Sequence, residues 1–139
     1  MFQVFYYPLY TLLPFRIDFH SGEPVYEQVI YAAKKAILSG VLSPGERFPS
    51  VRSLSQELKI NPNTAHKVVA ALTAEGLLAV HPGVGTVVAP SVPGSAEDRA
   101  QVLVQDTERL VVEASRLGLT EEQLLNAVRK HWRKLNPSP

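Results

Sequence analysis

The feature that most constrains the fold is an ordered series within residues 22–90, in which three helix-forming stretches precede a hairpin-forming one. Residues 25–39 carry apolar side chains at three- and four-residue spacing, which is typical of a helix with one buried face. The β-prone residues 77–81 and 86–89 flank residues 82–85, whose composition favours a tight turn. This order predicts a winged helix-turn-helix, mainly α with a small β-hairpin wing.

Capping residues indicate where the second and third helices begin and end. Ser50 can cap a second helix, which ends near Lys59. Asn61 and Pro62 favour the start of a third helix, because Asn is a good N-cap and Pro fits the first helical position. Gly76 ends that third helix. About three residues separate the two helices, which is the short connection that a helix-turn-helix needs.

Beyond the winged helix, the composition predicts a linker at residues 91–95 and two amphipathic helices in residues 96–139. Ser95 can cap the first of these helices, and Thr120 with Gln123 predicts a capping box for the second. Two helices this short cannot form an independent core, so they must pack on the winged helix or on another copy of the chain. We predict a helical dimerisation tail, with an apolar face formed by Leu103, Leu110, Ala114, Leu117, Leu124, Val128 and Trp132.

The N-terminal arm, residues 1–21, opens with a stretch of fifteen uncharged residues. This stretch is too short to span a bilayer, and Pro8 and Pro14 interrupt it, so we expect no membrane role. Three interpretations of the arm stay open. It packs on the body of the protein, it packs on a partner subunit, or it arises from a misassigned start.

The composition indicates a folded chain without catalytic or metal chemistry. Apolar residues form 45% of the chain and charged residues 19%, so we expect a buried core. There is no cysteine, which excludes thiolate catalysis, thiolate zinc sites and disulfides, and which suits the reducing cytoplasm. The four histidines are scattered and form no metal-binding pair. No nucleophile, base and oxyanion donors occur together, so we expect no cofactor, no metal and no enzymatic activity.

The candidate DNA-reading residues lie at the start of the third helix. Its apolar stripe faces inward and leaves Asn63, Thr64, His66 and Lys67 exposed, with the reach to hydrogen-bond base edges in a major groove. An ordinary solvated helix face explains the same residues equally well. The charge balance does not decide the question, because the net charge is only +1.

Three further candidates, Ser50, Arg52 and Ser53, lie in the first turn of the second helix. Arg52 is a cation at the positive end of a helix dipole, a placement that favours an arriving anion, although the side chain could equally extend into solvent. In the wing, Gly83 permits a sharp turn and a close approach to a DNA backbone. His81 is the titratable residue near the wing tip, so we expect a modest contribution from the wing.

Over about half of its length, the chain resembles the GntR family of bacterial regulators. The resembling motifs are PVYEQ (24–28), ILSGVLSPGERFPSVR (37–52), LS (54–55), NPNT (61–64), Leu72, EGL (75–77) and GVGT (83–86). The resemblance implies a winged-helix DNA-binding domain, with contacts at Ser50, Arg52, Asn63, Thr64, His66, Lys67 and Gly83. The tail is similar to that of the short YtrA-type branch, whose two C-terminal helices mainly dimerise.

From these features we predict a cytoplasmic, homodimeric transcriptional regulator that binds double-stranded DNA at a palindromic operator and acts as a repressor. The tail is too short to enclose a roomy pocket, so a small-molecule effector either does not exist or binds at a dimer or domain interface. The alternative is a winged helix that serves as a protein-interaction module without specific DNA binding. Salt dependence separates the two, because DNA affinity falls steeply with salt and an apolar protein contact does not weaken in this way.

Overall fold

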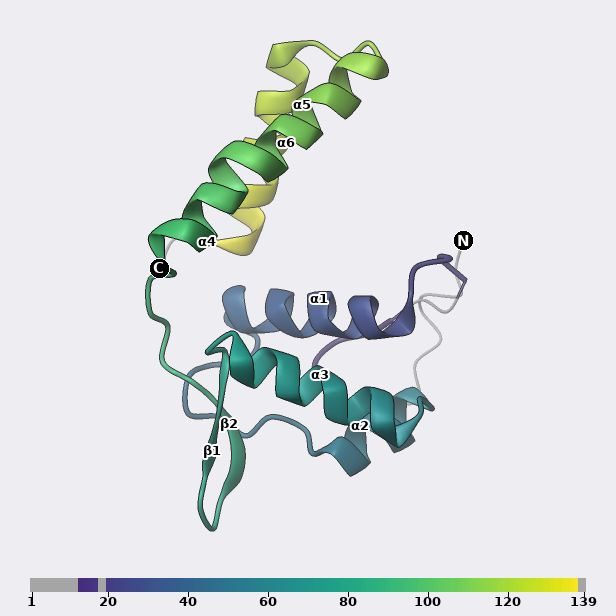
Figure 1. Ribbon diagram of the computed structural model, residues 1–139, viewed down its shortest axis with the longest axis vertical. Helices are drawn as coiled ribbons and strands as arrows, with labels where there is room; N and C mark the ends of the chain where they lie inside the picture. The colour runs from purple at the N-terminus through teal and green to yellow at the C-terminus, as the bar shows by residue number, and fades with distance from the viewer. Residues whose placement is uncertain (1–12, 18–19, 138–139) are drawn as a thin grey trace. The chain divides into compact units, whose positions relative to one another are not determined.

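The computed structural model describes residues 13–17 and 20–137, and the chain divides into two compact units at the boundary between Ser91 and Val92. The elements of the first unit are α1 (Val25–Leu38), α2 (Val51–Leu58), α3 (Pro62–Ala74), β1 (Leu78–His81) and β2 (Gly85–Val88) (Figure 1). The elements of the second unit are α4 (Ala96–Ala100), the π-helical segment η2 (Gln101–Asp106), α5 (Thr107–Arg116) and α6 (Glu121–Leu135). The predicted fold class, mainly helical with a two-stranded wing, is confirmed.

Side-chain caps fix the two helices of the helix-turn-helix. The Ser50 hydroxyl accepts a hydrogen bond from the Ser53 backbone N–H at 3.0 Å, and the Asn61 side chain accepts one from the Asn63 N–H at 2.8 Å. Between the helices, Lys59 adopts a left-handed conformation with φ of 55°, which turns the chain sharply at the end of α2. The helix boundaries predicted from these caps are confirmed to within two residues.

The core of the first unit lies where α1, α2, α3 and the hairpin meet. Its largest fully buried side chains are Leu54, Leu72, Val29, Val68 and Val88. Each comes from the apolar face of its helix or from the inner side of β2, so the amphipathic spacing of the sequence builds this core directly.

The hairpin differs by one residue from the predicted strands. β1 and β2 pair from Leu78 with Val88 to His81 with Gly85, so Gly85 is part of a strand and the turn is shorter than expected. The Val84 N–H donates to the His81 carbonyl at 3.0 Å, and Gly83 has φ of 79°, as the third position of a tight turn with proline at the second requires.

A third strand-like segment extends the wing sheet. Arg47 forms an antiparallel bridge with Val87, the Gly45 N–H donates to the Val88 carbonyl at 2.8 Å, and the Phe48 N–H donates to the Thr86 carbonyl at 2.9 Å. The pairing of this segment with β2 attaches the loop before α2 to the wing.

Part of the N-terminal arm packs on the first unit. Phe15 is buried, and Leu13 and Ile17 are half-buried against the core. The Phe15 ring stacks on that of Phe48. Residues 1–12, which make up most of the predicted uncharged stretch, lie outside the described residues.

The second unit begins with a helix that is not α-helical throughout. The sequence predicted an uninterrupted α-helix after Ser95, and this is wrong at residues 101–106, where the helix is π-helical. Side chains reinforce the wide turn at five-residue spacing: Gln101 Nε2 donates to Asp106 Oδ1 at 3.1 Å, and Thr107 Oγ1 donates to the Val102 carbonyl at 2.7 Å.

The π segment alters the predicted apolar face, because a π turn contains more residues than an α turn. Leu103, inside the segment, does not continue the α-helical line of Leu110, Ala114 and Leu117. The last helix agrees with the prediction: Thr120 and Gln123 form a capping box, with hydrogen bonds of 2.9 and 3.1 Å.

Candidate nucleic-acid interface

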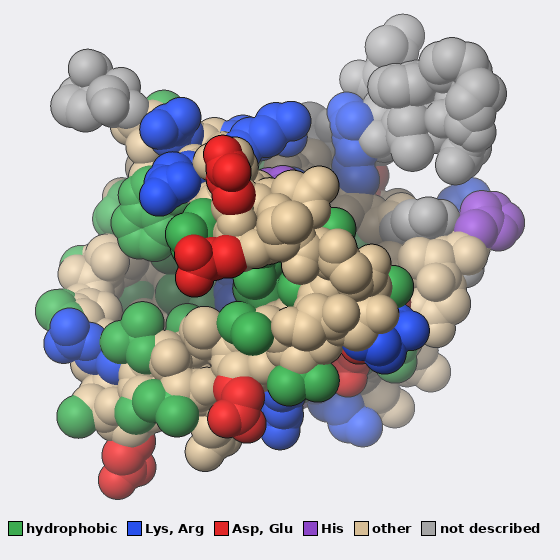
Figure 2. Space-filling view, turned by 90° about the horizontal axis from the view of Figure 1, so that it is seen from above, with side chains coloured by type: hydrophobic (Ala, Val, Ile, Leu, Met, Phe, Trp, Pro, Cys, Tyr) green, Lys and Arg blue, Asp and Glu red, His purple; other side chains and the backbone are tan. Residues whose placement is uncertain are grey.

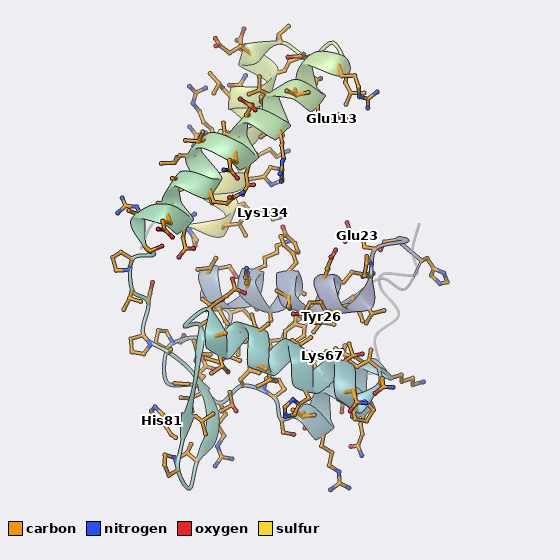
Figure 3. The ribbon with its side chains drawn as sticks, viewed as in Figure 1. Glu23, Tyr26, Lys67, His81, Glu113 and Lys134 are labelled. Atoms are coloured by element: carbon orange, nitrogen blue, oxygen red, sulfur yellow. The ribbon has the colours of Figure 1, made fainter. Side chains whose placement is uncertain are left out.

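The N-terminal end of α3 presents polar side chains to solvent. Ala65 and Val68 are fully buried and orient the helix. Asn63, His66 and Lys67 are exposed, whereas Thr64 is half-buried. Figure 3 shows Lys67 on α3. Three of the four predicted base-reading residues are therefore exposed, and Thr64 is partly accessible.

The first turn of α2 holds the second group of predicted contacts. The Ser50 hydroxyl caps the helix, and it also donates a hydrogen bond to the Ser53 hydroxyl at 3.1 Å. Arg52 is exposed and has no ion-pair partner within the described ranges. The structure thus gives Ser50 and Ser53 a structural hydrogen bond, and it leaves Arg52 available for an anion.

The wing can contact a partner through its backbone, but it carries no basic side chain. Gly83 is exposed at the tip, and nothing within 4 Å would meet a Cβ there, so its positive φ is what requires glycine. His81 is exposed on β1 near the same turn (Figure 3). The sequence of the wing, residues 77–90, contains no Lys or Arg.

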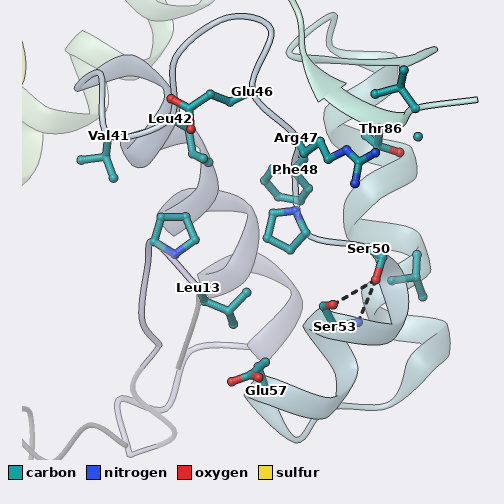
Figure 4. Close-up of a pocket in the computed structure, with 15 residues that line it drawn as sticks. Leu13, Val41, Leu42, Glu46, Arg47, Phe48, Ser50, Ser53, Glu57 and Thr86 are labelled. Atoms are coloured by element: carbon teal, nitrogen blue, oxygen red, sulfur yellow. Dashed lines mark hydrogen bonds between the residues drawn. The ribbon is translucent and has the colours of Figure 1, made fainter. Parts of the chain in front are cut away.

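A groove of about 800 Å³ connects the start of α2 with the wing (Figure 4). Ser50 and Ser53 line it from α2, and Gly85 and Thr86 line it from β2. Arg47, which is not among the site residues predicted from the sequence, lines the same groove. In the sequence, the one indication of Arg47 as a site residue is its place beside the apolar Phe48, just before the Ser50 cap.

The predicted dimerisation residues differ in their exposure. Ala114 is the one buried apolar side chain among the described residues of the second unit, and Leu124 is half-buried. The remaining predicted residues are exposed to between 46% and 72%: Leu103, Leu110, Leu117, Val128 and Trp132.

The same unit exposes further apolar side chains. They are Val92, Val102, Val104, Val111, Val112, Leu119 and Leu125. Hydrophobic side chains are visible at the protein surface between charged ones (Figure 2). This much uncovered apolar surface on a unit with almost no buried core indicates that something else covers it.

One ion pair in the second unit shifts the acidity of its members. The Arg116 guanidinium, which is hydrogen-bonded to Glu113, lowers the pKa of the Glu113 carboxyl, and Glu113 raises the pKa of Arg116. Both groups are exposed, so solvent screening makes the pair a minor contributor to stability.

The described residues also bear on metal binding and on membrane insertion. Across these ranges, no group of three or more His, Asp or Glu side chains could hold a metal ion. None of the helices in the described part of the chain has the length and apolar character needed to span a membrane.

Comparison with known proteins gives consistent matches. Residues 25–88 match the model of the bacterial regulatory proteins of the gntR family. The HTH-type transcriptional repressor YtrA of Bacillus subtilis is 32% identical over 110 residues, which is 78% of this chain and 85% of that protein.

Two solved structures are similar over most of the chain. YtrA from Sulfolobus acidocaldarius, a GntR-family transcription factor, is 26% identical, with a TM-score of 0.51 over 87% of this chain and 98% of the other. A transcriptional antiterminator from Listeria monocytogenes shares the fold at 24% identity, with a TM-score of 0.79 over 89% of this chain and 93% of the other.

Proposed function

Because the chain belongs to the GntR family of bacterial regulatory proteins, whose members are DNA-binding transcriptional regulators and not enzymes, we propose that it acts as a homodimeric repressor on a palindromic operator. The observation that carries the proposal is the free N-terminal end of α3, with Asn63, His66 and Lys67 exposed. A chain that acts on chromosomal DNA works in the cytoplasm.

In this proposal α3 enters the major groove with its N-terminal end first. Asn63 suits an adenine edge, and Lys67 suits a guanine edge or a phosphate. The start of α2 faces the DNA backbone, where Arg52 binds a phosphate and the helix dipole adds to the attraction. Gly83 lets the wing tip approach the adjoining minor groove.

The homodimer is supported by the uncovered apolar surface of the second unit. Leu110, Leu117, Val128 and Trp132 are each at least 46% exposed, which is costly for residues of this size. A second copy carries the same surface, and a two-fold contact between identical faces covers both. The resulting two-fold axis relates two recognition helices, so the operator has two half-sites about one helical turn apart.

Repression is supported by the likeness to a relative that is a transcriptional repressor, at 32% identity. A dimer seated on a promoter blocks polymerase without any further activity. A small-molecule effector binds at the dimer interface, because a tail this short encloses no roomy pocket of its own.

The test is a mobility-shift titration of the full-length protein against duplexes selected from a random pool. We expect a selected palindromic duplex to bind, and we expect the affinity to fall steeply between 50 and 200 mM salt, in the way that phosphate-binding proteins behave. Arg52→Ala weakens the shift, and Arg109→Ala, which removes another exposed arginine in α5, does not. If no duplex is selected at low salt, the proposal is wrong.

The alternative, a protein-interaction module, is favoured by one observation, the net charge of only +1. In the same titration, the interaction module predicts binding through the apolar tail surface. Such binding is insensitive to salt and to Arg52→Ala.

A further inference from the structure

The wing presents a problem for a DNA-binding surface. Phosphate neutralisation by Lys and Arg supplies much of the affinity for DNA. Yet residues 77–90, which include both wing strands, contain neither. A wing that approaches the DNA backbone therefore needs a cation from another part of the fold.

The segment before α2 supplies this cation. Arg47 pairs with Val87 in the strand-like segment beside β2, and the backbone hydrogen bonds on either side of it join this segment to β2. Neighbouring residues of a strand point to opposite sides. Phe48 is buried in the core with 4% of its surface exposed, so Arg47 extends to the outer side and is exposed.

The surroundings of Arg47 leave its charge available. No ion pair or hydrogen bond connects its guanidinium to any residue of the described part of the chain. In the groove, the Arg47 side chain extends toward Thr86, whereas Glu46 lies toward the opposite side and Glu57 lies below Ser53 (Figure 4). The Glu46 carboxylate is already engaged, because it accepts a hydrogen bond from the Ser43 N–H at 2.9 Å.

We propose that Arg47 binds a phosphate of the DNA strand that passes between the start of α2 and the wing. The groove it lines is bounded by Ser50 and Ser53 on one side and by Gly85 and Thr86 on the other. In the proposed binding mode, with α3 in the major groove, these two elements lie on either side of one DNA backbone. The inference rests on the proposed function, and it adds to that function the cation that the wing sequence lacks.

Two substitutions at Arg47 test the effect of its charge separately from the packing of its side chain on the sheet. Residues directly opposite each other in neighbouring strands extend to the same side, so the aliphatic part of Arg47 adjoins Val87, which is 3% exposed. Arg47→Met keeps an aliphatic side chain over Val87 and removes the charge. Arg47→Lys keeps the charge. The matched control is Lys35→Met, which removes an exposed cation from the last turn of α1.

The measurement is the dissociation constant at several salt concentrations, for the selected operator duplex and for an unrelated duplex of equal length. We expect Arg47→Met to weaken binding to both duplexes by about tenfold and to reduce the slope of log affinity against log salt by about one per protomer. Arg47→Lys retains the wild-type slope, as does Lys35→Met. All variants melt at the wild-type temperature.

Two results overturn the inference. One is an unchanged salt slope in an Arg47→Met protein that melts like the wild type. The other is weakening of the operator complex alone, because this indicates base reading rather than phosphate binding. Failure of the wild-type protein to bind either duplex is a different outcome, since it contradicts the proposed function itself.

Discussion

Phe15 stacks on Phe48, with ring centroids 6.1 Å apart and ring planes inclined by 20°. The contact joins the N-terminal arm to the segment that pairs with the wing. Leu13 and Pro14 of the arm line the same groove as Arg47, so the arm supports the side of the molecule on which the groove lies. The arm is thus part of the winged-helix body at residues 13–17.

Removing the Phe15 ring should destabilise the protein. Phe15 is 7% exposed, and truncating a buried aromatic side chain costs about 3 kcal/mol of unfolding free energy, because it removes apolar burial and leaves a cavity. We expect Phe15→Ala to lower the urea midpoint accordingly in a circular-dichroism titration. Tyr31→Ala is the control, since Tyr31 is 65% exposed. Equal midpoints for Phe15→Ala and the wild type would show that the stacking contributes nothing.

A substitution at Ser50 separates helix capping from DNA contact. Asp caps a helix about as well as Ser and suits the positive end of the dipole, so Ser50→Asp should keep the melting temperature. It also places a negative charge in the groove, and so it should weaken DNA binding strongly. Ser50→Ala should do the reverse, with a loss of about 1 kcal/mol of stability and a smaller effect on affinity.

Thermal melts and mobility shifts of both Ser50 variants test this separation. DNA affinity that follows stability in the two proteins, instead of charge, would place Ser50 away from the DNA.

Asn63 should act on specificity. If it reads a base edge, Asn63→Ala weakens operator binding by about 1–3 kcal/mol and relaxes the preference at one base position. Binding to unrelated duplexes should change little, since phosphate contacts supply it. Asn126→Ala, an exposed change on α6, is the matched control. Equal losses on operator and unrelated DNA would argue against base reading by Asn63.

Trp132 should be required for self-association. Its side chain is 68% exposed on α6, and a glutamate there would place a charge in the proposed dimer contact. We expect Trp132→Glu to weaken the dimer by at least about tenfold in sedimentation equilibrium. Val92 is 70% exposed but lies outside the helices, so Val92→Glu should leave the dimer intact. A wild-type chain that sediments as a monomer at all concentrations would refute this account of the tail.

The elements that the sequence predicted best are those set by local chemistry. The Ser50 cap and the Asn61-Pro62 start act within one helical turn, and both appear where expected. The capping box of Thr120 and Gln123 is equally local. The candidate residues of α3 followed from the same periodicity, because the positions of Ala65 and Val68 decide which side chains face outward.

The features that the sequence did not reveal depend on pairing or on a small difference in hydrogen bonding. The bridge between Arg47 and Val87 joins residues that are forty positions apart, so no local pattern reports it. The one-residue shift of β2 arises because Gly85 tolerates a φ of 108° and pairs with His81. In the second unit, the π turn at residues 101–106 keeps an α-like sequence pattern while it rotates Leu103 out of line.

The central claim is that the start of α3 is the surface that meets DNA, and backbone NMR of the full chain titrated with the selected operator tests it most directly. We expect the largest amide shift changes at residues 61–67, with further changes at residues 50–53 and near Gly83. Changes confined to residues 96–137, with the α3 amides unmoved at saturating DNA, would contradict the account.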